Sequence, residues 1–98
     1  MLEISFEHTY PNTPPFVRIV RPRFIYRTGH VTVGGSFCIE SLTSKGWESA
    51  RTMQGVLMEV LCLIQTGGGR LQIKNSRDYT LKEAKSAFIR TLKVHNWT

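Results

Sequence analysis

The sequence predicts an α+β domain, and three patterns carry this prediction. Two short segments near the N-terminus have the residue patterns of strands, and two segments in the second half repeat apolar residues at helical spacing. Between them lies a glycine-rich stretch with neither period. A chain of 98 residues that is 41% hydrophobic can enclose one modest core, so we expect a single domain over residues 1–98.

The two strands are expected first, and they should pair antiparallel. Leu2, Ile4 and Phe6 alternate with polar residues, which is the period-two pattern of a strand with one buried face. Residues 16–20 are rich in β-branched side chains, and Pro22 should end this second strand.

A rigid turn and a long loop follow from the prolines and glycines. Three prolines among residues 10–15 fix several backbone angles and predict a turn. Residues 23–46 lose all periodicity, and a loop of this length in a compact domain is usually functional or disordered. Its apolar residues favour an ordered course, and the three glycines ahead of Cys38 would let the backbone approach a ligand closely.

Two helices are expected in the second half of the chain. Thr52 is a suitable N-cap for a first helix that should run to about Gln65 and stop at glycines 67–69. Residues 80–83 form a capping box for a second helix. His95, near the end of that helix, is expected to have no chemical role.

Charge and hydropathy narrow the classes of partner. The net charge of +6 would suit an anionic partner, but the chain has no block of like charge. We therefore do not expect a nucleic-acid role. No run of 18 apolar residues and no signal peptide occur, which predicts an intracellular protein without a membrane partner.

The two cysteines are expected to differ in role. They are too few for a disulfide framework and form no zinc motif, so reduced thiols and no metal are expected. Cys62 lies on the apolar first helix and should be a small buried side chain. Cys38 is the candidate nucleophile, with Ser36, His30 and Glu40 close enough in sequence to orient a proton or an amine.

Two ordered motifs add a family resemblance to this pattern. The turn YPNTPP at residues 10–15 matches a Y-P-x-x-P-P hallmark, and FCIESL at residues 37–42 matches an active-site run that often reads I-C-L-D-x-L. With these motifs the chain resembles the catalytic core of ubiquitin-conjugating enzymes over nearly its whole length. It is most similar to the Q class, on PPFVRIVRP (14–22) and GGSFCIESLTSKGW (34–47).

The resemblance implies a fold and a reaction. The fold would be a partial UBC-like α+β fold, with an antiparallel strand pair, a long active-site loop and two C-terminal helices. The family's N-terminal helix and first strands are absent from this sequence, so we expect a truncated domain. Cys38 would take ubiquitin's C-terminal carboxyl as a thioester and pass it to a lysine amine.

The resemblance also implies partners and site residues. The partners would be ubiquitin, an activating enzyme and a ubiquitin ligase, in the cytoplasm or nucleus, with no cofactor. His30 stands eight positions before Cys38, where most members have the Asn of an H-P-N tripeptide that the Q class also lacks. His30 could donate to an oxyanion or hold the loop, and Glu40 could position the acceptor amine or be simply solvated. The ligase-binding residues would be Asn12, Thr13, Glu48, Ser49 and Ala50, and the structural turn would use Tyr10, Pro11, Pro14 and Pro15.

Two other interpretations remain open. An inactive UBC-like module that only binds ubiquitin or a ligase would keep the turn and helices but would have no use for a reactive thiol. A cysteine protease is the weaker interpretation, because GSFC lacks a protease signature and the small scaffold leaves little room for a separate His and Asn pair.

Overall fold

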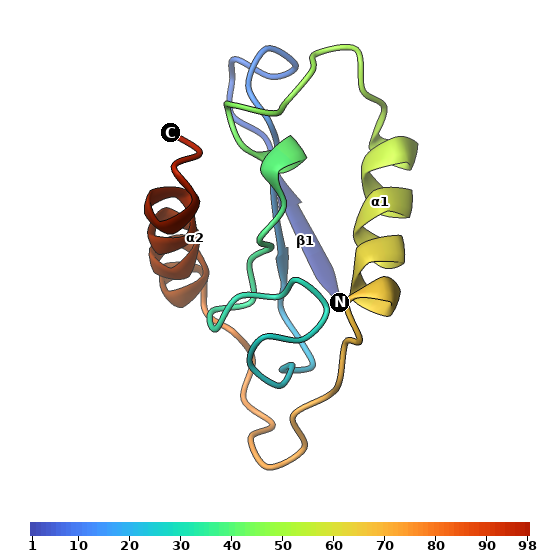
Figure 1. The fold of residues 1–98 in the computed structure, drawn as a ribbon, viewed down its shortest axis with the longest axis vertical. Coiled ribbons are helices and arrows are strands. Elements are labelled where there is room, and N and C mark those ends of the chain that lie inside the picture. The colour runs from blue at the N-terminus through green and yellow to red at the C-terminus, as the bar shows by residue number, and fades with distance from the viewer.

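Two helices stand on either side of a two-stranded sheet, and the long loop runs between them (Figure 1). The computed structural model describes residues 1–98. The elements are β1 (Leu2–Ser5), β2 (Phe16–Ile19), a short 3-10 helix η1 (Glu40–Leu42), α1 (Met53–Thr66) and α2 (Leu81–His95). This arrangement is the α+β class that the sequence predicts, in the part of the UBC-like fold that the chain covers.

The strands pair antiparallel, as predicted, with Leu2 opposite Ile19 and Ile4 opposite Val17. β1 ends one residue before Phe6, which is 51% exposed instead of extending the buried face. The chain turns there, and the Phe6 ring lies edge-on against Tyr10 with centroids 4.7 Å apart. The prolines of the turn end the ladder, because proline offers no amide hydrogen.

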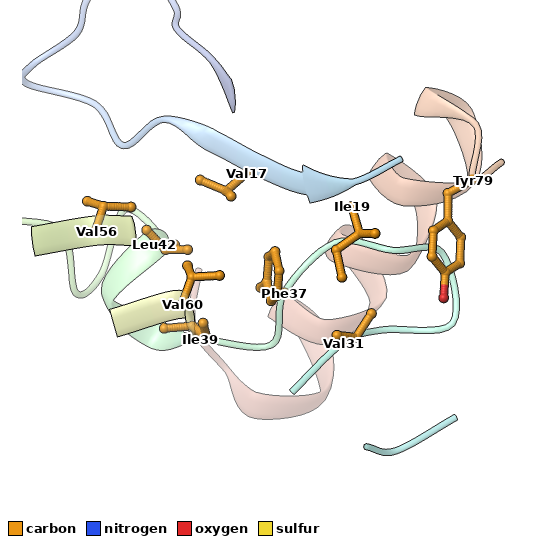
Figure 2. Packing of buried hydrophobic residues seen from close by; sticks show 9 residues of the cluster. All are labelled: Val17, Ile19, Val31, Phe37, Ile39, Leu42, Val56, Val60 and Tyr79. Atoms are coloured by element: carbon orange, nitrogen blue, oxygen red, sulfur yellow. The ribbon is translucent and has the colours of Figure 1, made fainter. Parts of the chain in front are cut away.

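The loop supplies nearly half of the hydrophobic core. Figure 2 shows the core cluster, in which loop residues lie between β2 and α1. Phe37 is the largest fully buried side chain, and each buried side chain of this size stabilises the fold by roughly 1.5–3 kcal/mol. The ordered, packed course expected for this loop is confirmed. The cluster consists of Val17, Ile19, Val31, Phe37, Ile39, Leu42, Val56, Val60 and Tyr79.

α1 begins at its predicted cap and buries a narrow face. The Thr52 hydroxyl oxygen accepts a hydrogen bond from the Gly55 amide at 3.0 Å. Val56 and Val60 are fully buried, whereas Cys62 is exposed on the other side of the helix. The expectation that Cys62 is buried is therefore wrong. A two-stranded sheet with one loop covers only one stripe of the helix, so apolar residues beyond that stripe remain in solvent.

α2 carries the capping box that the sequence predicts. The Thr80 hydroxyl accepts from the Glu83 amide at 3.1 Å, and the Glu83 carboxylate accepts from the Thr80 amide at 2.7 Å. Its buried face centres on Ala84 and Ala87. Small residues at these places let the loop approach the helix closely. Neither helix is both long and apolar enough to cross a membrane.

Candidate functional site

Residues 30–38 form a small hairpin that presents Cys38. The Cys38 amide donates to the His30 carbonyl at 2.8 Å, and the Thr32 amide donates to the Ser36 carbonyl at 2.8 Å. A bridge between Val31 and Phe37 lies between these two bonds. Extended residues point alternately to opposite sides. Since Phe37 and Ile39 point into the core, Cys38 faces outward and is half-buried.

A histidine from the end of α2 lies against this thiol. His95 Nε2 is 3.4 Å from Cys38 Sγ, although the two residues are 57 positions apart in sequence. The imidazole stacks on Trp97, with ring centroids 4.4 Å apart and planes 19° from parallel. The expectation that His95 has no chemical role overlooked this contact. No local pattern indicates it, because only the tertiary fold brings α2 to the hairpin.

Burial sets the resting state of the thiol. Loss of contact with water raises the pKa of Cys38, because desolvation disfavours the thiolate. The group is therefore a thiol at neutral pH, and a nucleophile forms only when a base takes the proton. His95 is the one side chain within hydrogen-bonding distance of the sulfur.

His30 supports Cys38 mainly through its backbone. Its φ of 59° is left-handed, a conformation that histidine adopts more readily than most residues, and its carbonyl receives the Cys38 amide. Its ring lies beside the end of α1, where a Cβ added at Gly67 would come within 2.8 Å of the His30 Cδ2. The imidazole makes no hydrogen bond within the chain. These contacts favour the loop-holding role over the oxyanion role.

Glu40 begins η1, two residues after the thiol. Its carbonyl accepts hydrogen bonds from the Thr43 hydroxyl at 2.7 Å and the Thr43 amide at 3.0 Å. Its carboxylate is exposed and has no partner within the chain. The side chain is therefore free to meet an incoming group, and its acceptor-positioning role remains a prediction.

The two segments expected to bind a ligase lie at one end of the molecule. The Trp47 indole donates to the Pro11 carbonyl at 2.8 Å, and the rings of Trp47 and Tyr10 lie 6.4 Å apart. This contact joins the proline turn to the residues that follow Trp47. Pro15 is fully buried in the turn and Pro14 is half-buried. Of the five expected residues, Thr13 is half-buried and the others are exposed: Asn12, Glu48, Ser49 and Ala50.

A polar cluster that the sequence analysis missed joins η1 to α1. Glu59 on α1 accepts hydrogen bonds from the Ser41 hydroxyl and the Arg51 guanidinium, each at 2.7 Å. Burial alone would raise the pKa of Glu59, but these two hydrogen bonds and the charge of Arg51 lower it. The cluster fixes the helical turn that follows Cys38.

A groove of about 600 Å³ opens at Cys38. Its walls are the hairpin, the preceding loop and α2. The site thus comprises a half-buried thiol, an adjacent imidazole and an open groove. It defines a class of small α+β domains built to carry a group on a cysteine.

The family is shown by comparison with known proteins. The family model described as Ubiquitin-conjugating enzyme matches residues 1–96. The chain belongs to the ubiquitin-conjugating enzyme family. The resemblance drawn from the two sequence motifs is thereby confirmed.

The relatives place the chain near the Q class of that family. A Q-like ubiquitin-conjugating enzyme of Drosophila melanogaster is 35% identical over 97 residues, which cover 97% of this chain and 31% of the relative. Ubiquitin-conjugating enzyme E2 Q1 of Homo sapiens is 34% identical over 96 residues, which cover 97% of this chain and 22% of the relative. A human Q-like protein 1 is 34% identical over 98 residues, covering 97% and 60%. The chain therefore spans between about a fifth and three fifths of the relatives it matches.

Proposed function

We propose that Cys38 carries ubiquitin as a thioester and passes it to a lysine amine. The observation that supports this most directly is the Cys38–His95 pair, 3.4 Å apart at the mouth of a groove. A module that only binds ubiquitin or a ligase has no need for a thiol beside a base and a groove.

The proposed charging step begins with proton transfer from the thiol. His95 takes the proton of Cys38, and the thiolate attacks the carbonyl of the thioester between ubiquitin and the activating enzyme. The C–S bond to Cys38 forms, and the activating enzyme's sulfur leaves as a thiolate. Since burial raises the pKa of Cys38, the base is needed at neutral pH.

The proposed transfer step needs a hydrogen-bond donor and a deprotonated amine. The amine attacks the thioester carbonyl, the tetrahedral oxyanion collapses, and the Cys38 thiolate leaves. The Cys38 amide cannot donate to this oxyanion, because it already donates to the His30 carbonyl. A ring N–H of His95 or His30 is the available donor, and the exposed Glu40 can hold the amine.

A charging assay tests this function. The chain is incubated with activating enzyme, ATP and ubiquitin, and the products are separated on a non-reducing gel. We expect an adduct that thiol reductant removes, that Cys38→Ala abolishes and that Cys62→Ala leaves intact. Cys38→Ser should give an ester adduct that withstands reductant.

Two results would contradict the proposal. An adduct that persists in Cys38→Ala would place the carrier elsewhere. Absence of any adduct, with the chain folded by circular dichroism, would favour the inactive binding module. The proposed ligase contact at Asn12, Thr13, Glu48, Ser49 and Ala50, and the setting in the cytoplasm or nucleus, belong to this same function.

A further inference from the structure

The groove at Cys38 carries positive charge and no negative charge. Its thirteen lining residues include two arginines, Arg27 and Arg90, and two histidines, but no aspartate or glutamate. Both arginines are exposed, and the ion pairs of the chain all use other arginines. Arg27 lies over the Tyr26 ring at 5.4 Å, which leaves its N–H groups available. The groove therefore presents two cations without partners beside the thiol.

Apolar side chains lie between these charges. Val33, Val94 and Tyr26 line the groove and are 53%, 79% and 63% exposed. Exposed apolar surface next to free charge is typical of a binding surface, because an occupant can bury the former and neutralise the latter.

We propose that this groove binds the acceptor protein through a segment in which acidic and apolar side chains alternate. The proposal rests on the proposed function, since an occupant at the mouth of Cys38 is placed to supply the attacking amine, and it adds the chemistry of the acceptor. Charge complementarity selects this occupant: an acidic segment is attracted by Arg27 and Arg90, whereas a basic one is repelled.

The groove suits a peptide better than a nucleic acid. Single-stranded nucleic acids bind where aromatic rings form successive stacking platforms along a basic track. Here one tyrosine ring is flanked by valines, and the two arginines are the only permanent cations on the walls. The valines fit the apolar side chains of a protein segment.

The first test measures binding without any thioester. The probe is a fluorescein-labelled peptide in which glutamates alternate with valines around a single lysine, titrated with the chain in a fluorescence anisotropy assay. A double variant, Arg27→Glu with Arg90→Glu, should weaken binding roughly tenfold, and added salt should weaken the wild-type complex. The matched control is Lys82→Glu with Lys85→Glu, which makes the same charge change on exposed positions of α2 and should leave binding nearly unchanged.

Several outcomes would overturn the proposal. One is equal binding of a peptide with glutamine in place of glutamate, and another is equal loss in the control variant. Tighter binding of an oligothymidine probe to the same two arginines would make the occupant a nucleic acid. Since all four substituted residues are exposed, the variants should fold, and circular dichroism checks this.

The second test separates the acceptor from the carried ubiquitin. In the charging assay the groove variant should form its thioester at the wild-type rate, while discharge to the acidic peptide should slow roughly tenfold. Slower charging with unchanged discharge would assign the groove to ubiquitin and overturn the proposal. If no thioester forms in any variant, the proposed function fails, and the anisotropy result still decides whether the groove binds acidic peptides.

Discussion

Cys38 owes its reactivity to neighbours that are distant in sequence as well as to those beside it. Phe37 and Ile39 are anchored in the core and turn the thiol outward, and His95 meets it from another element. Burial raises the pKa of Cys38 and suppresses the free thiolate. The imidazole compensates for this, so the site holds a nucleophile that is quiet until its proton has somewhere to go.

Replacing His95 tests this role at the level of a single residue. We expect His95→Gln to slow charging by about 100-fold at neutral pH, which is typical for loss of a general base. In the variant the rate should rise about tenfold per pH unit, because thiolate then forms only by simple ionisation of a thiol whose pKa burial raises.

The control for that substitution is His8→Gln, on an exposed residue of the N-terminal turn. It should leave both rate and pH profile unchanged. A His95→Gln chain whose pH profile coincides with that of the wild type would show that His95 only fills space beside the thiol.

The sequence predicts some of these residues and not others. Cys38 could be singled out because the flanking motif is local and specific. His95 could not, because its chemistry depends on a contact across 57 positions. Cys62 was misjudged for a related reason: an apolar helix was taken as buried all round, although the sheet covers only the stripe with Val56 and Val60.

At the scale of elements, the hairpin is placed by its close contact with α2. The Ser36 hydroxyl donates to the Ala84 carbonyl at 2.9 Å. A Cβ at Gly34 would overlap the Glu83 carbonyl, so the hairpin tip and the first turn of α2 are in direct backbone contact. The position of Cys38 relative to His95 depends on this contact.

Adding one methyl group at Gly34 should therefore disturb both stability and the site. We expect Gly34→Ala to lower the free energy of unfolding by about 1–3 kcal/mol, since the backbone has to shift to relieve the overlap. Urea denaturation measures this change, and charging should slow in the folded fraction.

Gly55→Ala is the matched control because it lies in the first turn of α1. Its nearest neighbour to an added Cβ is the Thr52 hydroxyl at 3.3 Å, and alanine favours the helix. This variant should be as stable as the wild type or up to about 1 kcal/mol more stable. If both variants behaved alike, the tight packing at Gly34 would be refuted.

The sequence predicts the elements more fully than their arrangement. Both helix caps, the strand pair and the turn were predicted because each depends on residues within a few positions of one another. The hairpin at residues 30–38 was missed, since its ladder is only a few hydrogen bonds long and its strands lack alternation. The Ser41–Arg51–Glu59 cluster was also missed, because its partners lie on separate elements.

At the scale of the whole molecule, three carboxylates tie the elements together. Glu59 links η1 to α1, Glu83 links the cap of α2 to Arg23 at 2.9 Å, and Asp78 pairs with Arg21 at 2.9 Å. Burial alone would raise the pKa of Glu83, but hydrogen bonds from Thr80 and Arg23 and the charge of Arg23 lower it. A hydrogen bond from Arg21 likewise lowers the pKa of Asp78.

These lowered pKa values predict a loss of stability in acid. The unfolded chain binds more protons than the folded one below the ordinary glutamate pKa of about 4.3, so the free energy of unfolding should fall as pH drops through this value and on through the lowered folded pKa values. Above that range the contribution is fully present. Urea denaturation at neutral pH and at about pH 3 measures the difference.

Substitution of one linking carboxylate gives the contrast. Glu83→Gln should be less stable at neutral pH and should lose less on acidification, because one of the titrating groups is gone. Glu7→Gln, at an exposed carboxylate without a partner, should keep the wild-type pH dependence. An unchanged acid response in Glu83→Gln would remove this carboxylate from the pH linkage.

The separation of these contacts along the chain determines the order in which the molecule can form. The bonds from Arg18 to Tyr79, from Ser36 to Ala84 and from Cys38 to His95 span 61, 48 and 57 positions. Contacts this distant cost loop entropy and tend to form late and slowly. During synthesis, which proceeds from the N-terminus, the cysteine leaves the ribosome long before its histidine does. The nascent thiol thus remains without its base until α2 is made and docks, so activation of the cysteine coincides with completion of the fold.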